Sequence, residues 1–426
     1  ILDAEAKPKF SFTGTLTSFE DWAAYAGAAA ASSLIIALVV LLLIPAVGLQ
    51  GYLLVSGIVG LVVSGALFIV EASSLRYVDW GTFGGALFIV PAGLFTGLLL
   101  ITETSEWALS MWRNGRKCLP SGPLAHYPKV SIHVPAHNEP PQMVMQTLNA
   151  LARLDYEDFE VIVLDNNTSD PADWKPVEAY CRAQGSKFRF YHFEDMKGFK
   201  AGALNKALEL THPDAAFIGV IDSDYQVMPH WLKRAMPAFA DPTVAIFQGP
   251  QDYRDAHESL FKSMCYEEYT GFFRIGMVER NEHNAIIQHG TMCVVRRDAM
   301  EKVGGWAEWC ITEDTELGLR LFEAGHTGHY TSESLGRGLM PDTFAAYKSQ
   351  RYRWVYGAMQ IMKRHAAQIF RGKSKLTLAQ RYHFVAGWLP WFADGFALIF
   401  GVLAMIWSLL MAIAPKYFDV PLTALS

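Results

Sequence analysis

Long uncharged runs dominate the first hundred residues of this chain and recur near its end. No charged residue occurs from Trp22 to Val70, a run too long for one membrane span of about 20 residues. Helix-breaking residues between Pro45 and Gly51 divide this run in two. The pattern therefore predicts four transmembrane helices, over residues 27–47, 51–70, 80–102 and 395–415. Buried helices of a soluble core are the alternative, but core helices of this length normally carry a polar face.

The distribution of basic residues predicts how these spans are oriented. No acidic residue occurs in the basic stretch from Lys363 to Arg381. By the positive-inside rule we expect residues 104–362 in the cytoplasm and residues 1–26 outside it. Residues 363–394 also carry apolar side chains, so we expect either an interfacial helix on anionic lipid or a solvated linker. Residues 416–426 are left as a short C-terminal segment.

Between the spans, short β-rich runs alternate with segments of helical apolar spacing. The runs predict strands over residues 130–134, 159–164, 188–193 and 216–221, and helices over residues 143–154 and 200–210. Such alternation indicates an α/β domain of Rossmann-like type with a mostly parallel sheet. Ligands of these sheets bind beyond the carboxyl ends of the strands. Acidic residues gather at those ends, namely Asp165, Asp222 and Asp224.

Composition narrows the function classes. Hydrophobic residues make up 51% of the 426 residues, which favours a membrane protein. The net charge of -6 is mild and argues against a nucleic-acid-binding surface. The five cysteines include no CxxC pair, so neither a cysteine zinc site nor a disulfide framework is indicated. No basic segment precedes the first apolar run, so no signal peptide is expected.

The sequence Asp222-Ser223-Asp224 places two carboxylates two residues apart at a predicted strand end. Hard cations such as Mg²⁺ or Mn²⁺ prefer oxygen ligands and keep open positions for phosphate. A solvated turn is the alternative for an isolated pair of this kind. A glycine- and lysine-containing loop nearby, with Lys200 and Gly202, opens a predicted helix and suits an anion.

Two further motifs follow along the chain. Thr312-Glu313-Asp314 precedes an amphipathic helix, and Asp314 is the candidate base for an acceptor hydroxyl, although an acid there can also be a helix cap. In Gln350-Arg351-Tyr352-Arg353-Trp354, Arg353 can bind phosphate and Trp354 offers a flat face to a sugar ring. The alternative is a basic interfacial helix, to which Arg351 and Tyr352 would belong.

At this point a family resemblance emerges. Five motifs follow one another along the chain: Pro135-Ala136-His137-Asn138-Glu139, Asp165, Asp222-Ser223-Asp224, Thr312-Glu313-Asp314 and the QxxRW string from Gln350 to Trp354. In this order they closely resemble the motifs of family-2 glycosyltransferases with the GT-A fold. The QxxRW string is specific to processive membrane synthases of the cellulose, curdlan and hyaluronan type. The resemblance covers residues 125–365, and the flanking spans agree in kind.

The resemblance implies a set of site residues. Asp165 resembles the acid that reads uracil, Asp222 the acid at the diphosphate, Asp224 the metal ligand and Asp314 the base. The implied donor-binding residues are Pro135, Ala136, Asn138, Glu139, Asp165, Lys200, Asp222, Ser223, Gln350 and Arg353. The implied acceptor-binding residues are Trp354, Glu313, Thr312, His289 and Gly290. Asp224 and Asp222 would hold Mg²⁺ or Mn²⁺.

These observations together predict an inverting, metal-dependent polysaccharide synthase. We expect it to transfer glucose from UDP-glucose to a growing β-glucan, with a β-1,3 linkage suggested by analogy, and to pass the product across a bacterial inner (plasma) membrane. The alternatives are a non-processive enzyme that adds one sugar to a lipid carrier, and a synthase of another β-polysaccharide. Product export would need further transmembrane helices, from a longer chain or from another subunit. No signature of a cyclic-dinucleotide-binding domain is found.

Overall fold

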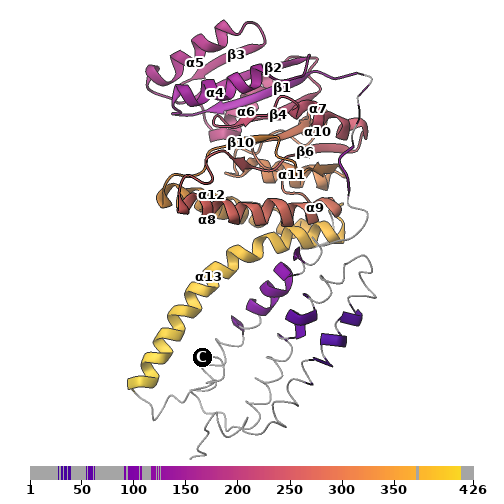
Figure 1. The fold of residues 1–426 in the computed structure, drawn as a ribbon, viewed down its shortest axis with the longest axis vertical. Helices are drawn as coiled ribbons and strands as arrows, with labels where there is room; N and C mark the ends of the chain where they lie inside the picture. Colours follow the sequence, from indigo (N-terminus) through magenta and orange to yellow (C-terminus); the bar gives the residue numbers. More distant parts are fainter. Residues whose placement is uncertain are drawn as a thin grey trace, which may run out of the picture. The chain divides into compact units, whose positions relative to one another are not determined.

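The computed structural model describes residues 126–370 and 374–413 continuously, and before them only short stretches, chiefly 95–104 and 117–120. The chain forms two compact units, residues 1–115 with 386–426, and residues 116–385. The second unit contains every motif residue named above, and its elements are labelled in Figure 1.

The second unit is built from short strands and intervening helices. Its strands are β1 (Val130–Ala136), β2 (Phe159–Asn166), β3 (Phe188–Phe193), β4 (Phe217–Val220), β5 (Gln226–Val227), β6 (Val244–Gln248), β7 (Asp252–Tyr253), β8 (Cys293–Arg296), β9 (Thr327–Tyr330) and β10 (Gly336–Gly338). Its shorter helices are α4 (Pro141–Ala152), α5 (Pro171–Ala183), α6 (Phe199–Leu210), α7 (Trp231–Ala235), η2 (Met236–Ala240), α8 (Leu260–Gly271), η3 (Phe272–Gly276), α9 (Met277–Glu282), α10 (Arg297–Lys302) and the amphipathic α11 (Glu313–Glu323). Two longer helices follow, α12 (Phe344–Phe370) and α13 (Leu378–Ile413).

A seven-stranded sheet in the order β3-β2-β1-β4-β8-β6-β9 forms the centre of this unit. Strands β1 to β4 pair in parallel, as does β6 with β9, whereas β8 runs antiparallel to both β4 and β6. A smaller sheet has the order β5-β10-β7. The predicted α/β architecture with a parallel sheet is therefore confirmed, and the four predicted strands agree with β1 to β4.

The two faces of β2 explain why its centre, from Val161 to Leu164, is apolar without alternation. Val161 and Val163 belong to the core cluster that includes residues of α4 and α5, whereas Ile162 and Leu164 pack with α6. All four side chains are at most 1% exposed. A strand covered by helices on both faces buries every side chain, so it loses the alternating pattern of a half-exposed strand. This burial fixes the carboxyl end of β2, where Asp165 lies.

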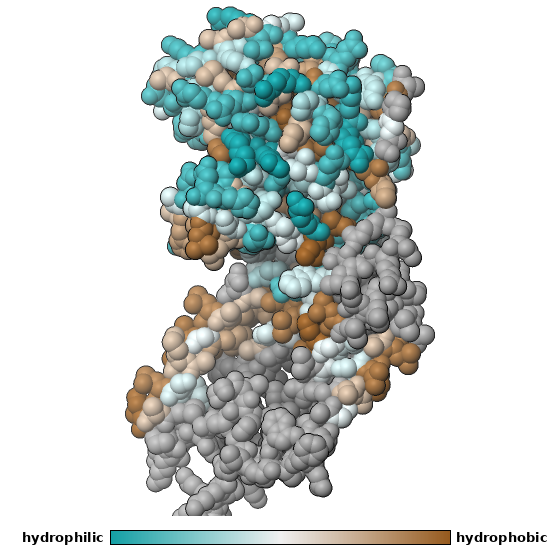
Figure 2. Space-filling view, viewed as in Figure 1, coloured by the Kyte–Doolittle hydropathy of each residue, from teal (hydrophilic) through white to brown (hydrophobic). Residues whose placement is uncertain are grey.

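Helix α13 differs from its prediction. The fourth span was predicted over residues 395–415, but the helix begins at Leu378 and continues through Pro390 to Ile413. Within the described residues, Leu378–Leu410 is the one helix long and apolar enough to cross a membrane. Figure 2 shows hydrophobic surface along it, and Leu398 and Met405 are 71% and 67% exposed.

The other predicted spans fall largely outside the described residues. Of residues 27–47, 51–70 and 80–102, the structure describes scattered positions and the shorter apolar helix Phe95–Thr104. The embedding of the chain by several helices therefore stays a prediction, as do residues 1–26 and 416–426 as separate segments.

The predicted interfacial segment 363–394 is partly buried. Of its apolar side chains, Ile369 and Leu376 are 1% and 5% exposed, so they do not face lipid, while Phe370 and Leu378 are exposed. The guanidinium of Arg381 donates to the carbonyl oxygens of Ile369, Ser374 and Leu376. This arginine thus holds the turn between α12 and α13 together and is not simply a lipid-facing charge.

Candidate active site

The strand-end acids lie along one edge of the sheet. Ala136 pairs with Asp165 across β1 and β2, and β4, which precedes Asp222, pairs with the other side of β1. The hydroxyl of Thr147 on α4 donates to the carbonyl oxygen of Ser223 at 2.7 Å. The parallel order thus brings the loop after β1, the end of β2 and the loop after β4 together, as the sequence predicted.

Asp165 is buried, with 4% of its surface exposed, and both of its carboxylate oxygens have partners. Thr168 donates its hydroxyl to Oδ2 at 2.8 Å, and the Nδ1 of His192 lies 2.7 Å from Oδ1. The imidazole of His192 stacks on the indole of Trp174, with ring centroids 4.3 Å apart. Sequence reasoning found Asp165 but missed Thr168, His192 and Trp174.

The loop after β1 is tied to the loop after β2. The backbone amide of Asn138 donates to the Thr168 hydroxyl at 2.8 Å, and the Nδ1 of His137 lies 2.6 Å from the carbonyl oxygen of Asn166. Asn138 has a φ of 52°, a left-handed conformation that asparagine tolerates better than most residues. Pro135 and Ala136 form the end of β1. The predicted donor-binding residues of this motif therefore belong to one connected loop pair.

Three carboxyl groups lie close together at the loop after β4. Burial, and then the charges of Asp224 and Asp222, raise the pKa of Glu139. Burial and the charge of Asp222 raise the pKa of Asp224 to about 6, although the backbone amide of Leu339 donates to its Oδ2 at 2.9 Å. Such mutual repulsion is what a divalent cation would relieve, and carboxylate oxygens are the ligands that Mg²⁺ and Mn²⁺ prefer. The donor set of Asp222 and Asp224 therefore fits the predicted metal.

Lys200 connects this acidic cluster to the next motif. Its ammonium donates to the Oδ1 of Asp222 at 2.5 Å and to the carbonyl oxygen of Gly290 at 3.0 Å. Burial alone would lower the pKa of Lys200, but the carboxylates of Asp222, Glu313 and Asp314 outweigh it and raise the pKa. The lysine therefore stays charged at the centre of the site.

Gly290 marks the closest approach between Lys200 and the predicted base. A Cβ at this position would lie 2.7 Å from the Lys200 ammonium and 3.1 Å from the Oδ2 of Asp314. The next residue, Thr291, accepts a hydrogen bond from the backbone amide of Asp222 at 3.1 Å. The loop His289-Gly290-Thr291 thus joins the loop after β4 to the start of α11.

His289 is turned away from this junction. Burial lowers the pKa of its imidazole to about 4, and its ring lies against Phe272 and Phe273, with centroids 5.5 and 5.1 Å away. Its Nδ1 is buried with no hydrogen-bond partner. The neutral imidazole thus lies among aromatic rings, and the role of His289 in acceptor binding stays a prediction.

The Thr312-Glu313-Asp314 motif opens α11, but its two acids lie in different surroundings. Glu313 is buried, at 4% exposed, and Asp314 is half-buried. Burial together with the neighbouring charge of Asp314 raises the pKa of Glu313. Burial also raises the pKa of Asp314, against the opposing effect of Lys200. Asp314 is therefore the more accessible acid of the pair. Its Oδ1 accepts the amide of Thr315 at 2.7 Å, so it also serves the helix start.

The QxxRW string lies on α12 and divides between two faces of that helix. Gln350 accepts the hydroxyl of Tyr269 at 2.5 Å, and the indole of Trp354 packs edge-on against the ring of Tyr269, 5.9 Å between centroids. Arg353 is exposed and donates to the hydroxyl of Ser349 at 3.4 Å. Gln350 and Trp354 are thus held by α8, whereas the guanidinium of Arg353 is open to solvent.

Arg351 does not face lipid. Its guanidinium carbon lies 4.4 Å from the ring centroid of Trp354, 4.9 Å from that of Tyr269 and 4.8 Å from that of Tyr347. A nitrogen of the guanidinium also lies 2.8 Å from Glu268. A cation over several aromatic faces is favourable, so Arg351 fixes the orientation of Trp354. The alternative of a basic interfacial helix therefore does not describe the surroundings of Arg351, whereas Tyr352 is exposed, at 68%.

A glycine lets α12 approach the Thr312 motif closely. A Cβ at Gly357 would lie 2.2 Å from the Thr312 hydroxyl and 2.6 Å from its methyl group. The side chain of Gln360 reinforces the contact by accepting the amide of Ile311 at 3.0 Å and donating to the carbonyl of Trp309 at 2.9 Å. The start of α11 and the helix α12 are therefore packed directly on one another.

This contact predicts a stability effect. Gly357→Ala should destabilise the protein by about 1–3 kcal/mol, the usual cost of overpacking, and lower its thermal midpoint. Gly271→Ala is the matched control, because no atom lies within 4 Å of a Cβ there. Adding Thr312→Gly to Gly357→Ala should restore part of the loss. Equal midpoints for the Gly357 and Gly271 variants would show that the close contact is absent in solution.

Comparisons with known proteins agree with this geometry. Residues 217–419 match the model of the glycosyl transferase family group 2. A probable glucomannan 4-beta-mannosyltransferase 1 of Arabidopsis thaliana is 28% identical over 255 residues, 58% of this chain and 46% of that protein. A probable glucomannan 4-beta-mannosyltransferase 2 of Oryza sativa subsp. japonica is 27% identical over 328 residues, 73% of this chain and 56% of that protein. The chain spans about half the length of these relatives.

Among solved structures, a mannosyltransferase from Pyrobaculum calidifontis, in complex with GDP-Man and Mn²⁺, superimposes with a TM-score of 0.57. The match covers 78% of this chain and 94% of that protein at 17% identity, so it supports the fold alone. The GT-A type of α/β fold is thereby confirmed. The relatives carry the names of mannosyltransferases, so the glucose specificity predicted above finds no support among them. Taken together, the ordered motifs, the match of residues 217–419 and the fold show that this region of the chain is similar to family-2 glycosyltransferases.

Proposed function

We propose that this chain is the catalytic part of an inverting, metal-dependent synthase that builds a β-linked polysaccharide from a nucleotide-diphosphate hexose. The observation that carries the proposal is the position of Lys200, whose ammonium contacts Asp222 at the strand ends and the Gly290 carbonyl beside Asp314. This arrangement puts a fixed positive charge between a diphosphate site and a candidate base.

The donor half of the site follows from the strand-end residues. Asp165, held by Thr168 and His192, would accept hydrogen bonds from the nucleobase at the rim of the sheet. Lys200 and Arg353 would bind the negative diphosphate, as cationic donors do. Asp222 and Asp224 would hold Mg²⁺ or Mn²⁺, which when bound neutralises charge on the leaving nucleoside diphosphate. Ser223 and Glu139 would support these two acids.

The acceptor half follows from α11 and α12. Asp314 would take the proton of an acceptor hydroxyl while that oxygen attacks the anomeric carbon and the bond to the diphosphate breaks. Attack from the face opposite the leaving group converts an α-linked donor into a β-linked product. Trp354 would carry the terminal sugar of the acceptor on its indole face, with Gln350, Thr312 and Glu313 around it. A half-buried lysine beside the base would stabilise negative charge that develops at the acceptor oxygen.

The identity of the donor is best tested directly. Motif resemblance favours UDP-glucose and a β-glucan, whereas the names of the relatives favour a mannosyl donor and a β-1,4 linkage. Purified chain should be incubated with a panel that contains UDP-glucose and GDP-mannose, with Mn²⁺ or Mg²⁺, followed by linkage analysis of the product. A β-linked hexan from one donor supports the proposal, and hydrolysis of every donor without any glycan product contradicts it.

Processivity and membrane location form the finer part of the proposal. Helix α13 would anchor the chain in a bilayer, with the catalytic unit on the cytoplasmic side of a bacterial inner membrane. Growth of the same acceptor over many cycles would need its end to remain bound, for which Trp354 is suited. Product size from radiolabelled donor decides this point: a polymer supports processive synthesis, and a single-sugar lipid supports the non-processive alternative.

Trp354 gives a prediction for the acceptor site. Trp354→Ala should reduce transfer at saturating donor by roughly 10-fold or more, because an acceptor sugar without its aromatic platform is misplaced for attack, and small misplacements cost up to about 10²-fold. Nucleotide affinity, measured by calorimetry, should change little. Tyr352→Ala, an exposed aromatic two residues away, is the control and should keep its activity. If nucleotide affinity weakens as much as turnover, Trp354 belongs to the donor site instead.

A further inference from the structure

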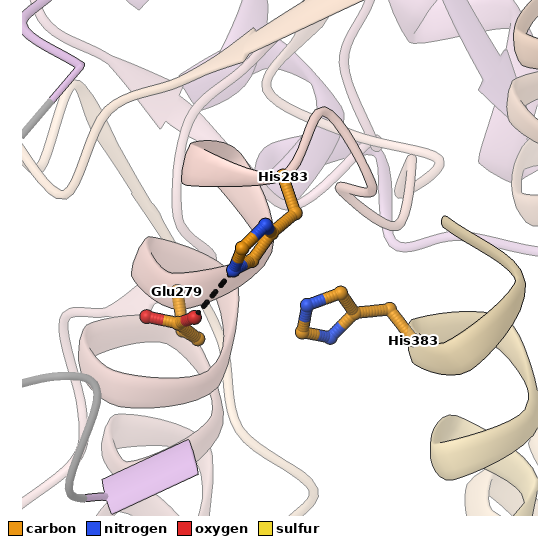
Figure 3. Close-up of side chains that lie close together, drawn as sticks. All are labelled: Glu279, His283 and His383. Atoms are coloured by element: carbon orange, nitrogen blue, oxygen red, sulfur yellow. Dashed lines mark hydrogen bonds and ion pairs between the residues drawn. The ribbon is translucent and has the colours of Figure 1, made fainter. Parts of the chain in front are cut away.

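A second cluster of metal-ligating side chains lies on elements that carry none of the residues assigned to sugar transfer. It consists of Glu279 on α9, His283 just after α9 and His383 in the second turn of α13, and it lies wholly within the second unit. One ligand atom from each residue lies within 4.8 Å of the other two. Figure 3 shows the imidazole of His383 turned toward His283 and Glu279.

The geometry of this cluster is close to that of a metal site. The Nε2 of His283 lies 3.0 Å from the Oε1 of Glu279, and the imidazole centroids of His283 and His383 are 5.1 Å apart. Ligands about 2.0–2.1 Å from a tetrahedral ion are about 3.3–3.4 Å from each other. Side-chain rotations that move the ligand atoms by about 1 Å would therefore close the site.

Burial supports a ligand role for these side chains. Glu279 and His383 are 1% and 2% exposed, and the Nδ1 of His383 is buried with no hydrogen-bond partner. Buried polar atoms without partners are uncommon and costly, so such an atom needs an explanation. The side chain of His283 is 34% exposed, which leaves a route by which an ion and a water molecule could enter.

The backbone around the cluster is already fixed. A guanidinium nitrogen of Arg280 donates to the carbonyl oxygen of His383 at 2.7 Å, and the side-chain amide of Gln380 donates to the carbonyl oxygen of Asn284 at 2.7 Å. These bonds join α9 and the residues after it to the first turns of α13. Ligands that are held in place before the ion arrives lose less entropy when it binds.

We propose that Glu279, His283 and His383 bind a transition-metal ion of the Zn²⁺ class and thereby cross-link the first turns of α13 to α9. Two imidazoles and one carboxylate form a donor set that suits zinc, with a fourth position for water. Mg²⁺ prefers oxygen ligands, so this site and the Asp222–Asp224 pair would select different ions. The ion makes α13 part of the rigid catalytic unit up to His383, independently of which sugar is transferred.

The test measures zinc binding by the full chain in detergent. Protein stripped with a chelator is dialysed against Zn²⁺ in the presence of excess Mg²⁺, and bound zinc is determined by elemental analysis. We expect one zinc ion per chain and a thermal midpoint that rises with zinc concentration, because a ligand bound only by the folded state stabilises it. Replacing Zn²⁺ with Co²⁺ should give the visible absorption of a four-coordinate site.

Variants separate this site from other zinc ligands. His283→Ala, Glu279→Gln and His383→Ala should each weaken zinc binding by at least about 10–100-fold, the range seen even for residues one step from the metal. His230→Ala is the control variant and should bind zinc normally, because the His230 side chain lies elsewhere on the unit and is 53% exposed. All of these proteins, including the parent, carry Cys118→Ser, which removes an exposed thiol that could bind zinc. His283→Ala and Glu279→Gln keep the test valid if His383→Ala fails to fold. No zinc bound by the parent protein at micromolar free zinc, or undiminished binding in these two variants, would overturn the proposal.

Discussion

Asp224→Ala is expected to abolish metal-dependent sugar transfer without unfolding the domain. Asp224 follows β4 and lies close enough to Asp222 and Glu139 for their charges to repel. In the proposed mechanism it is a direct ligand of the ion that neutralises the leaving diphosphate. Removing it should cost more than the roughly 10–100-fold lost when a residue that only supports a metal ligand is removed.

The measurement is turnover against Mn²⁺ and Mg²⁺ concentration, together with the thermal midpoint. Asp224→Asn is a necessary companion variant, because it keeps an acceptor for the backbone amide of Leu339 and so preserves the fold. Asp298→Ala is the control, since that carboxylate is exposed and paired with Lys302 on the surface. Full activity of Asp224→Ala with an unchanged metal requirement would remove Asp224 from the metal site.

The sequence was most informative about β1 to β4 and the acids that follow them. These strands are short β-rich runs, and in β2 burial on both faces makes the central run from Val161 to Leu164 continuously apolar. The second half of the sheet was not predicted strand by strand. Strands β6, β8 and β9 have five residues or fewer, and the antiparallel direction of β8 depends on pairing with β4 and β6.

The QxxRW motif alone did not predict which way the side chains of α12 point. Gln350 and Arg351 lie four and three residues before Trp354, so each is a neighbour of Trp354 on the helix, whereas Arg353 is exposed. That spacing could have placed Arg351 on the inner face. What it could not supply were the aromatic partners, because Tyr269 lies on α8, far away in the sequence. Only the fold therefore shows that Arg351 packs on aromatic rings.

The sequence also did not predict which residues surround Asp165, or that apolar residues near the basic segment are buried. The acid was found because it ends a strand, but His192, which fixes one of its oxygens, comes from the end of β3. Apolar residues near the basic segment suggested a lipid surface, yet Ile369 and Leu376 are buried in the protein. Hydropathy predicts that a side chain avoids water, and only the fold decides whether protein or lipid replaces it.

Asp314→Asn tests the choice of base, the step on which the proposed chemistry most depends. General-base catalysis typically contributes about 10²–10⁴-fold, so turnover should fall by at least that range. Asparagine keeps the shape of the side chain and can still accept the amide of Thr315, but it cannot accept a proton. Nucleotide affinity should change little, because Asp314 meets the acceptor and not the nucleotide in this mechanism.

Glu313→Gln is the matched comparison for Asp314→Asn. Glu313 is more deeply buried than Asp314, and its raised pKa favours the protonated form, which glutamine imitates. We therefore expect a smaller loss of turnover from Glu313→Gln than from Asp314→Asn, with unfolding midpoints close to that of the parent protein for both. The reverse order would make Glu313 the base. An α-linked product would reject in-line attack altogether, because a base on the acceptor side with no carboxylate nucleophile opposite it gives inversion at the anomeric carbon.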